Sequence, residues 1–278
     1  MKLAKFKSVA KYFCLFAAVL ITLFPLYWLV QISLKHRIDQ LAVPPIWFTL
    51  RITGEHYYDT FIARPFFSYL LNSLIVAFSA TLLSLVIGTM AAYSLARMKL
   101  PAKLSHHLSL WILSTRMFPP IVSIIPLYLI MRGLSMINTR GALVISYILF
   151  NLPFVVWMMR GFFQDIPKEL EESAMIDGDS RIGALCRVVL PIAAPGLAAT
   201  AIFCLIMSWN EFLFALILSQ TDDVMTLPVG ISRQVTQYEI RWGAMSAAGV
   251  VAIIPVLVFA MLVQRYLIRG LSFGAVKG

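Results

Sequence analysis

Six long apolar runs constrain this chain more than any other feature of its sequence. They cover residues 12–34, 69–96, 108–131, 141–163, 192–219 and 244–268. A bilayer core about 30 Å thick is crossed by about 20 helical residues, and each run is at least that long. The runs are continuous rather than alternating between apolar and polar residues, so they predict helices and not barrel strands. The sequence therefore predicts an all-α polytopic membrane protein with six transmembrane helices.

The balance of residue types supports a lipid environment. Hydrophobic residues make up 60% of the 278 residues and charged residues only 13%, whereas soluble domains carry about 25% charged residues. The net charge of +10 comes from bases in short segments between the runs, without the basic stripe that marks a nucleic-acid-binding face. We therefore expect the lipid bilayer as a partner and no nucleic acid.

The distribution of Lys and Arg predicts the orientation of the helices. The tails and loops on one side hold fourteen of these residues: Lys2, Lys5, Lys7, Lys11, Arg97, Lys99, Lys103, Arg160, Lys168, Arg181, Arg187, Arg265, Arg269 and Lys277. The loops on the other side hold only eight, and Arg116 lies within a run. Loops rich in Lys and Arg stay in the cytoplasm, so both termini are predicted to be cytoplasmic.

Segment 165–191 is unusually charged for this chain and predicts two short helices with a break between them. Asp165 is expected to cap the first helix, and Asp179 or Ser180 the second, because short polar side chains satisfy free N–H groups at helix starts. Gly178 is expected to end the first helix in the left-handed conformation. Pro191 would then mark the entry to the fifth span.

The first short helix carries a narrow apolar stripe on a charged surface. Ile166, Leu170 and Ala174 recur every four residues, which places them on one helix face. The small residues Ser173 and Ala174 permit close approach by another protein. Docking of a partner is one interpretation; the others are folding back onto the chain's own helices and lying flat on lipid, against which the acidic first turn argues.

This segment resembles the EAA signature of permease subunits of bacterial ATP-binding-cassette importers, which runs E-A-A, three residues, G, nine residues, I-x-L-P. It stands here as Glu172, Ser173, Ala174, Gly178, Val188, Leu190 and Pro191, with Ser173 and Val188 departing from the signature. The stretches STRMFPP, FNLPFVVWMMRGFF, SWNEFLFALIL and RGLSFGAVKG are similar to the MalG-type branch, which carries sugars, polyols and related solutes. These permeases are the inner membrane components of binding-protein-dependent transport systems.

The resemblance implies one permease domain over residues 1–278 in the bacterial cytoplasmic (inner) membrane. Its implied partners are a second, MalF-like permease, a cytoplasmic ATP-binding-cassette ATPase dimer and an extracytoplasmic solute-binding protein. The chain has no G-x-x-x-x-G-K-[ST] loop to cradle nucleotide phosphates, so ATP and Mg are expected on the ATPase and this chain is expected to be no enzyme. The implied ATPase-coupling residues are Glu172, Ser173, Ala174, Gly178, Leu190 and Pro191.

Polar groups inside a predicted span are costly in lipid and mark a candidate solute pathway. Arg116 is the only base well inside a run, and Pro119 and Pro120 beside it remove backbone donors and interrupt the helix. An interrupted helix that lines a cavity offers backbone groups to a solute. Snorkelling of Arg116, or pairing with an acid such as Glu211, is the structural alternative.

Trp209, Asn210 and Glu211 form a second candidate group in the fifth run. An indole face, an amide and a carboxylate suit the C–H patches and hydroxyl groups of a carbohydrate. Interhelical packing and hydrogen bonding explain them equally well. The sequence does not decide whether this chain or its partner permease holds the solute, nor which sugar or polyol it is; a neutral, hydroxyl-rich molecule is expected.

The remaining features leave few other functions open. Segments 35–68 and 220–243 are long enough to form a cap or a docking face for an external partner, or are simple connections. The three Cys and four His residues show no metal-ligand spacing, so no metal site is expected. An ion-coupled secondary transporter is the alternative, although it would need a coupling-ion site and often two related halves.

Overall fold

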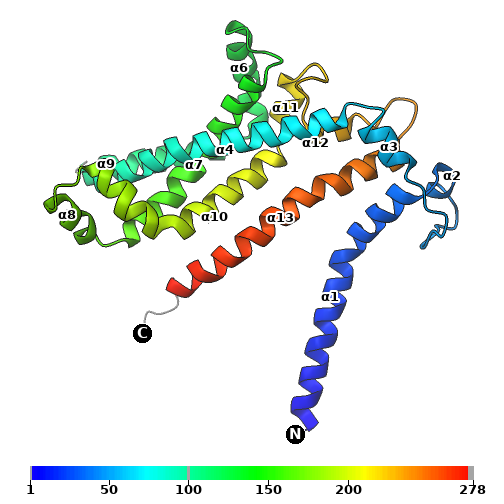
Figure 1. Cartoon of the computed structure of the whole chain (residues 1–278), viewed down its shortest axis with the longest axis horizontal. Coiled ribbons are helices and arrows are strands. Elements are labelled where there is room, and N and C mark those ends of the chain that lie inside the picture. The colour runs from blue at the N-terminus through cyan, green and yellow to red at the C-terminus, as the bar shows by residue number, and fades with distance from the viewer. Residues whose placement is uncertain (1, 99–100, 275–278) are drawn as a thin grey trace. The chain divides into compact units, whose positions relative to one another are not determined.

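Helices make up nearly all of the computed structural model, which describes residues 2–98 and 101–274 (Figure 1). Within these two ranges no strand forms, and extended pairing is confined to isolated bridges between Lys35 and Ile52 and between Val235 and Ile240. The predicted all-α class is confirmed. Lys99 and Lys277, two of the bases that predict the orientation, lie outside the described residues.

The chain divides into two compact units. Unit 1 comprises Met1–Phe67 and Gly230–Ile254, and unit 2 comprises Ser68–Val229 and Pro255–Gly278. The prediction of one permease domain over 1–278 stays a prediction. Each unit is described separately below.

Five helices of the described chain are long and apolar enough to cross a membrane. They are Ala10–Leu34 within α1 (Lys2–Leu34), Phe66–Arg97 (α4), Arg140–Asp165 (α7), Arg181–Trp209, and Trp242–Leu262 within α13 (Trp242–Gly274). A bent pair, His107–Met117 with Pro120–Gly133, makes a sixth span if it is counted as one. Counted in this way, the spans agree in number with the six that the sequence predicts.

The predicted third span is broken rather than straight. It consists of α5 (Ala102–Ser114), a 3₁₀ turn (Thr115–Met117) and α6 (Pro120–Gly133), with a bend of 94° at the break. Phe118 and Pro119 each precede a proline and are extended, with ψ of 128° and 129°, because a following proline ring disfavours the helical conformation. The predicted interruption by the two prolines is confirmed.

The predicted fifth span, 192–219, coincides with helices whose bounds differ from it at both ends. Its helix begins earlier, as α9 (Arg181–Ala184) and a π-helical turn (Leu185–Val189), and continues as α10 (Leu190–Trp209). Pro191 therefore lies inside the helix instead of at its entry; it supplies no N–H to the preceding turn, where the Leu190 N–H donates to the Leu185 carbonyl. After a break, α11 (Leu213–Leu218) follows.

The core of unit 2 forms where α4, α7 and α10 meet. Two glycines allow this close packing: a Cβ at Gly88 would lie 2.6 Å from Val155 Cγ1, and one at Gly196 would lie 2.5 Å from Phe162 Cδ2. Small residues of this kind let helix backbones approach closely in a membrane. The buried residues of this core are Ala92, Tyr93, Val155, Met159, Phe163, Ile166, Leu185, Val189, Ala193 and Cys204.

Unit 1 joins the end of α1 to short helices and to the start of α13. Its short helices are α2 (Arg37–Gln40) and α3 (Glu55–Phe61), and α12 (Leu227–Ser232) ends within it. Trp28 at the end of α1 lies 5.4 Å from the Trp47 ring, and the Lys35 ammonium lies 4.4 Å from the Trp28 ring centre. These aromatic and cation–π contacts fix the segment after α1 against the helix.

Candidate functional site

Helix α8 (Glu169–Ile176) begins one turn later than the sequence predicts. Ile166 is extended, with ψ of 127°, because it precedes Pro167. Asp165 is therefore the last residue of α7 and does not cap the next helix, so that prediction is wrong. Lys168 holds the cap position without a side-chain hydrogen bond. The three acidic residues of the first turn of α8 still stabilise it through the helix dipole.

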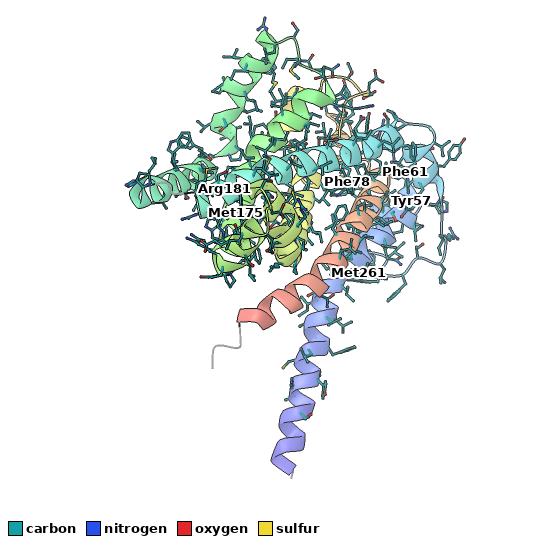
Figure 2. All side chains as sticks on the ribbon, turned by 60° about the vertical axis from the view of Figure 1, so that its left-hand side comes forward. Tyr57, Phe61, Phe78, Met175, Arg181 and Met261 are labelled. Atoms are coloured by element: carbon teal, nitrogen blue, oxygen red, sulfur yellow. The ribbon has the colours of Figure 1, made fainter. Side chains whose placement is uncertain are left out.

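The break after α8 follows the predicted glycine pattern. Gly178 has φ of +97°, a conformation that costs a residue with a side chain about 1–2 kcal/mol. The Gly178 N–H donates to the Met175 carbonyl at 3.2 Å, and the Asp179 N–H to the Ala174 carbonyl at 3.0 Å. These two bonds define a Schellman motif, so the prediction for Gly178 is confirmed. Met175 and Arg181 flank the break (Figure 2).

The second short helix is capped by Ser180, one of the two predicted residues. The Ser180 hydroxyl oxygen accepts a hydrogen bond from the Gly183 N–H at 3.0 Å. The Asp179 carboxylate instead pairs with Arg187 at 2.6 Å. A Cβ at Gly183 would lie 2.2 Å from that carboxylate, so the glycine leaves room for the Asp179 side chain. Helices α8 and α9 lie together at one end of unit 2 (Figure 1).

Sequence reasoning missed the residues that hold α8 in place. The Glu171 carboxylate is buried and accepts hydrogen bonds from Arg97 Nε and from the Tyr93 hydroxyl. Tyr93 and Arg97 stand one turn apart on the same face of α4. Apart from the i,i+4 spacing of Tyr93 and Arg97, nothing local in the sequence signals that Glu171 is their partner.

The rest of α8 faces away from the core of unit 2. Glu172 and Ser173 are exposed, Ala174 is half-buried, and Leu170 and Ile176 are 45% and 86% exposed. Ile166 is buried in the core of unit 2 and lies outside α8, so the predicted apolar stripe is wrong in its first member. The remaining coupling candidates lie outside α8: Gly178 in the exposed break, and Leu190 and Pro191 at the start of α10.

The broken third span places Arg116 beside a cavity. This cavity of about 700 Å³ is lined mainly by apolar side chains, with Thr115, Ser123 and Ser146 among its few polar ones. The Arg116 guanidinium lies 4.8 Å from the Phe154 ring centre and 3.6 Å from the Met207 sulfur. It forms no ion pair with Glu211 or any other described acid, so the structural pairing considered from the sequence does not occur.

The break after α10 brings two of the predicted polar residues to a neighbouring cavity. Asn210 and Glu211 line this cavity of about 470 Å³ together with Pro120. The Glu211 carboxylate accepts hydrogen bonds from the Phe214 and Ala215 N–H groups at 2.9 and 3.2 Å, which caps the start of α11.

The six candidate pathway residues are therefore only partly assembled. Arg116 and Pro120 line the larger cavity, and Pro120, Asn210 and Glu211 line the smaller one. Trp209 is only 3% exposed and lines neither cavity, which favours packing over solute contact. Pro119 also lines neither cavity and shapes the break instead.

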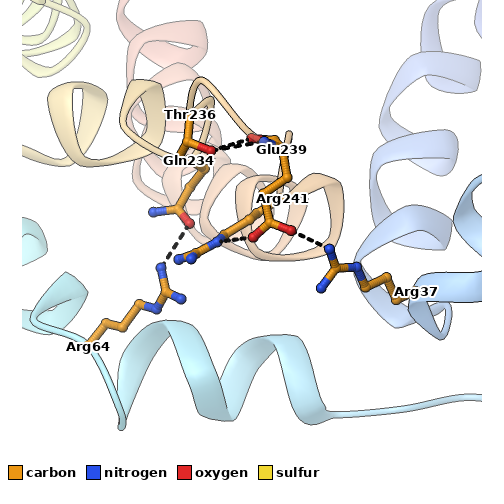
Figure 3. Close-up of polar contacts among 6 residues, drawn as sticks. All are labelled: Arg37, Arg64, Gln234, Thr236, Glu239 and Arg241. Atoms are coloured by element: carbon orange, nitrogen blue, oxygen red, sulfur yellow. Dashed lines mark hydrogen bonds and ion pairs between the residues drawn. The ribbon is translucent and has the colours of Figure 1, made fainter.

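A polar cluster gathers residues of both outer segments within unit 1 (Figure 3). The Glu239 carboxylate pairs with Arg37 and, at 2.7 Å, with Arg241, while Arg64 donates to Gln234 at 3.4 Å. The hydrogen bond from Arg241, together with the charge of Arg37, lowers the pKa of Glu239. The cluster borders a cavity of about 230 Å³.

The other part of the 220–243 segment belongs to unit 2. The Tyr69 hydroxyl donates to Asp222 at 2.7 Å, and the Asn72 amide donates to the carbonyls of Asp223 and Met225 at 2.9 Å. Arg140 in turn donates to the Asn72 amide oxygen at 2.8 Å. The buried side chains of Tyr69 and Asn72 thus anchor this loop to α4, and Arg140 at the start of α7 holds the Asn72 amide. No group of three or more potential metal ligands occurs in the described part of the chain.

Interrupted membrane helices beside cavities, together with a short helix presented outward, define a membrane transport permease. The chain belongs to the family described as the binding-protein-dependent transport system inner membrane component, which matches residues 84–273. It is thus an inner membrane transport component, and the alternative of an ion-coupled secondary transporter is wrong.

Several relatives align over almost the whole chain. The sulfoquinovosyl glycerol transport system permease protein SmoH of Agrobacterium fabrum is 38% identical, covering 92% of this chain and 89% of its own. The diacetylchitobiose uptake system permease protein DasC of Streptomyces coelicolor is 38% identical, covering 92% of each chain. The trehalose/maltose transport system permease protein MalG of Thermococcus litoralis is 36% identical, covering 93% of each chain. The predicted MalG-type resemblance is confirmed.

A solved structure shares the fold. A chain of a bacterial ABC transporter involved in the import of the acidic polysaccharide alginate superposes with a TM-score of 0.81 at 21% identity. The match covers 96% of this chain and 98% of that chain. The two chains therefore share one fold.

Proposed function

We propose that this permease imports a sugar or polyol by alternating access, driven by a separate ATPase. The relatives at 36–38% identity are named for the transport of a sulfoquinovosyl glycerol, diacetylchitobiose, and trehalose or maltose, all of which are glycosides. Family membership supports a system that depends on an external solute-binding protein. The bundle would rock between outward-open and inward-open states, a two-state element biased from one end.

The observation that carries this proposal is that α8 exposes one face to solvent, away from the core of unit 2. Leu170, Ser173 and Ile176 are exposed on a short helix whose end is fixed by the glycine motif at Gly178. Exposed apolar residues beside small and acidic ones form a surface that suits a protein partner. The partner proposed here is a cytoplasmic ATP-binding-cassette ATPase dimer, which would carry ATP and Mg. Glu172, Ala174, Leu190 and Pro191 complete the proposed coupling residues.

Two further partners have features that support them. In α1, the apolar window of the span contains no buried residue, and Ile121 and Ile125 of α6 are 61% and 67% exposed. These surfaces suit lipid and a second, MalF-like permease. The polar cluster around Glu239 in unit 1 offers charged groups to the extracytoplasmic solute-binding protein. This assignment places both termini in the cytoplasm.

The solute pathway is proposed to run along the two helix breaks. Arg116, Asn210 and Glu211 supply polar groups to cavities lined mainly by apolar and aromatic side chains, which is the mixture that recognises sugars. Pro119 and Pro120 keep the third span open at this point. Trp209 supports the break from within the helix packing.

Co-purification tests the proposed assembly. The chain is tagged, extracted gently from native membranes, and compared with Gly178→Val and Gly161→Val. A β-branched residue is strained at the φ of Gly178, whereas a Cβ at Gly161, within α7, meets no atom within 4 Å. We expect a second permease and an ATPase with the wild type and with Gly161→Val, and selective loss of the ATPase from Gly178→Val. A wild-type chain that elutes alone and transports without ATP contradicts the proposal.

A further inference from the structure

A buried ion pair joins α8 to the end of α4. Arg97 lies in the last turn of α4, and its Nε donates to Glu171 Oε1 while its Nη2 donates to the Ile166 carbonyl at 2.8 Å. The Tyr93 hydroxyl donates to the other Glu171 oxygen at 2.8 Å. One guanidinium thus connects the ends of α4 and α7 with the first turn of α8.

The pair is shielded from water on both sides. The side chains of Arg97 and Glu171 are 5% and 6% exposed, and the Tyr93 ring packs edge-on against Phe163 at 5.8 Å. A charge that loses its partner in such surroundings carries a large desolvation penalty. The two side chains therefore resist separation far more than an exposed pair would.

Glu171 is also the one buried residue of α8, all of whose residues the structure describes. The remaining positions of α8 are exposed or half-buried. Helix α8 packs against α9 and the π-helical turn Leu185–Val189, which lead into α10. The inward face of α8 adds a separate route to the membrane helices, because Glu171 forms an ion pair with Arg97 of α4.

We propose that the Arg97–Glu171 pair, supported by Tyr93, is the positioning link that makes α4 follow α8 when the ATPase moves α8. This inference rests on the proposed function, in which a separate ATPase drives the permease through α8. Docking belongs to the outward face around Leu170 and Ser173, and transmission belongs to the inward face at Glu171. The outward face of α8 thus serves docking and its inward face serves transmission. Substitutions on the outward face are therefore expected to lose the ATPase, whereas substitutions on the inward face are expected to keep the ATPase and lose coupling.

Glu171→Gln tests the link in the complete transporter, purified with its ATPase subunits and reconstituted into proteoliposomes with the binding protein. The change keeps the side-chain shape and removes the charge that holds Arg97. We expect the ATPase to co-purify in wild-type proportion and to hydrolyse ATP, while solute transported per ATP falls about ten-fold, within the range of known coupling energies. The matched control is Glu169→Gln, an exposed position on the same helix, which should keep wild-type coupling.

A distance measurement separates transmission from simple stabilisation. Nitroxide labels are placed at Met98→Cys and Asp177→Cys, both exposed, after replacement of the three natural cysteines. If α4 follows α8, the label distance in the wild type stays the same with and without ATP. In Glu171→Gln the distance should change or broaden when ATP is added, because α8 then moves alone.

The outcomes are distinct. Wild-type coupling and an unchanged distance in Glu171→Gln overturn the link. Loss of the ATPase from Glu171→Gln also overturns it, because the pair then serves docking or folding rather than transmission. If the wild-type chain itself purifies without an ATPase, the proposed function fails and the link falls with it.

Discussion

At the residue scale, Glu239 is the acid most strongly engaged by neighbouring charges in unit 1. The Arg241 guanidinium hydrogen-bonds its carboxylate, Arg37 adds a second positive charge, and the pKa of Glu239 is lowered from 4.5. A carboxyl whose pKa is lower in the folded state stabilises the fold above its ordinary pKa, and this contribution is lost as pH falls through the folded-state pKa. The cluster is therefore complete at neutral pH and opens only in acid.

Amide hydrogen exchange of segment 234–241, corrected for the intrinsic pH dependence, measures this effect. We expect constant protection in the wild type from neutral pH down through the ordinary pKa of a glutamate, and a loss of protection only at more acidic pH, because the pKa of Glu239 is lowered. Glu239→Gln should lack the protection already at pH 7. Glu55→Gln, on the border of the same cavity, should behave as wild type. Equal exchange in Glu239→Gln and wild type at pH 7 would show that the pairing does not order this segment.

Local rules predict some residues of the candidate site and not others. Gly178 and Ser180 follow from chemistry within a few residues of chain, namely a left-handed helix end and a side-chain cap. Asp165 was wrongly expected to cap α8 because the proline at 167 ends α7 at that point and delays α8. The Arg97–Glu171 pair joins residues 74 positions apart, and no local pattern specifies such a partner.

At the element scale, α7 and α10 pack closely at one glycine. A Cβ at Gly196 would lie 2.5–2.6 Å from three atoms of the Phe162 ring, so Gly196→Ala forces the ring or a backbone to move. Overpacking of this kind costs about 1–3 kcal/mol. We expect a lower thermal midpoint for the detergent-solubilised variant, measured by the loss of its size-exclusion peak on heating.

Two further variants test that explanation. Gly161→Ala, where a Cβ meets no atom within 4 Å, should leave the midpoint unchanged or raise it slightly, because alanine favours the helix. Adding Phe162→Leu to Gly196→Ala should recover part of the loss by making room. A midpoint for Gly196→Ala equal to that of the wild type would mean that this crossing is not tightly packed.

The sequence predicts which elements exist better than where they end. The apolar run 192–219 gives no sign of the break after Trp209, because Phe212 and Leu213 continue the hydrophobic pattern. The break forms where the Glu211 carboxylate caps the start of α11. The helix of this span begins before residue 192, because the charged turn from Arg181 continues into α10, and hydropathy alone gives no sign of this continuation. Pro119 and Pro120 predict a break in the third span, but its bend of 94° depends on packing within unit 2.

At the scale of the whole molecule, the three cysteines provide a test of orientation. Cys186 is exposed in the π-helical turn Leu185–Val189, which belongs to the segment assigned to the cytoplasm, Cys14 is exposed within the first span, and Cys204 is buried. We expect a membrane-impermeant maleimide to leave the chain unlabelled in intact cells when it is expressed without partner subunits. After permeabilisation the same reagent should label Cys186, because only this thiol faces water.

A cysteine on the opposite side supplies the control. Tyr238 is 96% exposed in the cluster of unit 1 assigned to the outside, so Tyr238→Cys combined with Cys186→Ser should be labelled in intact cells. Labelling of Cys186 in intact cells, with Tyr238→Cys reached only after permeabilisation, would reverse the assigned orientation and place both termini outside.

The buried pair between positions 97 and 171 also limits how the gene can change. A substitution at either position alone strands a charge in apolar surroundings and costs about 3–5 kcal/mol, whereas joint replacement by apolar residues is often neutral. An evolving gene can lose the Arg97–Glu171 pair only through two substitutions that arise together or in quick succession. Descendants of the gene should therefore inherit both residues or neither.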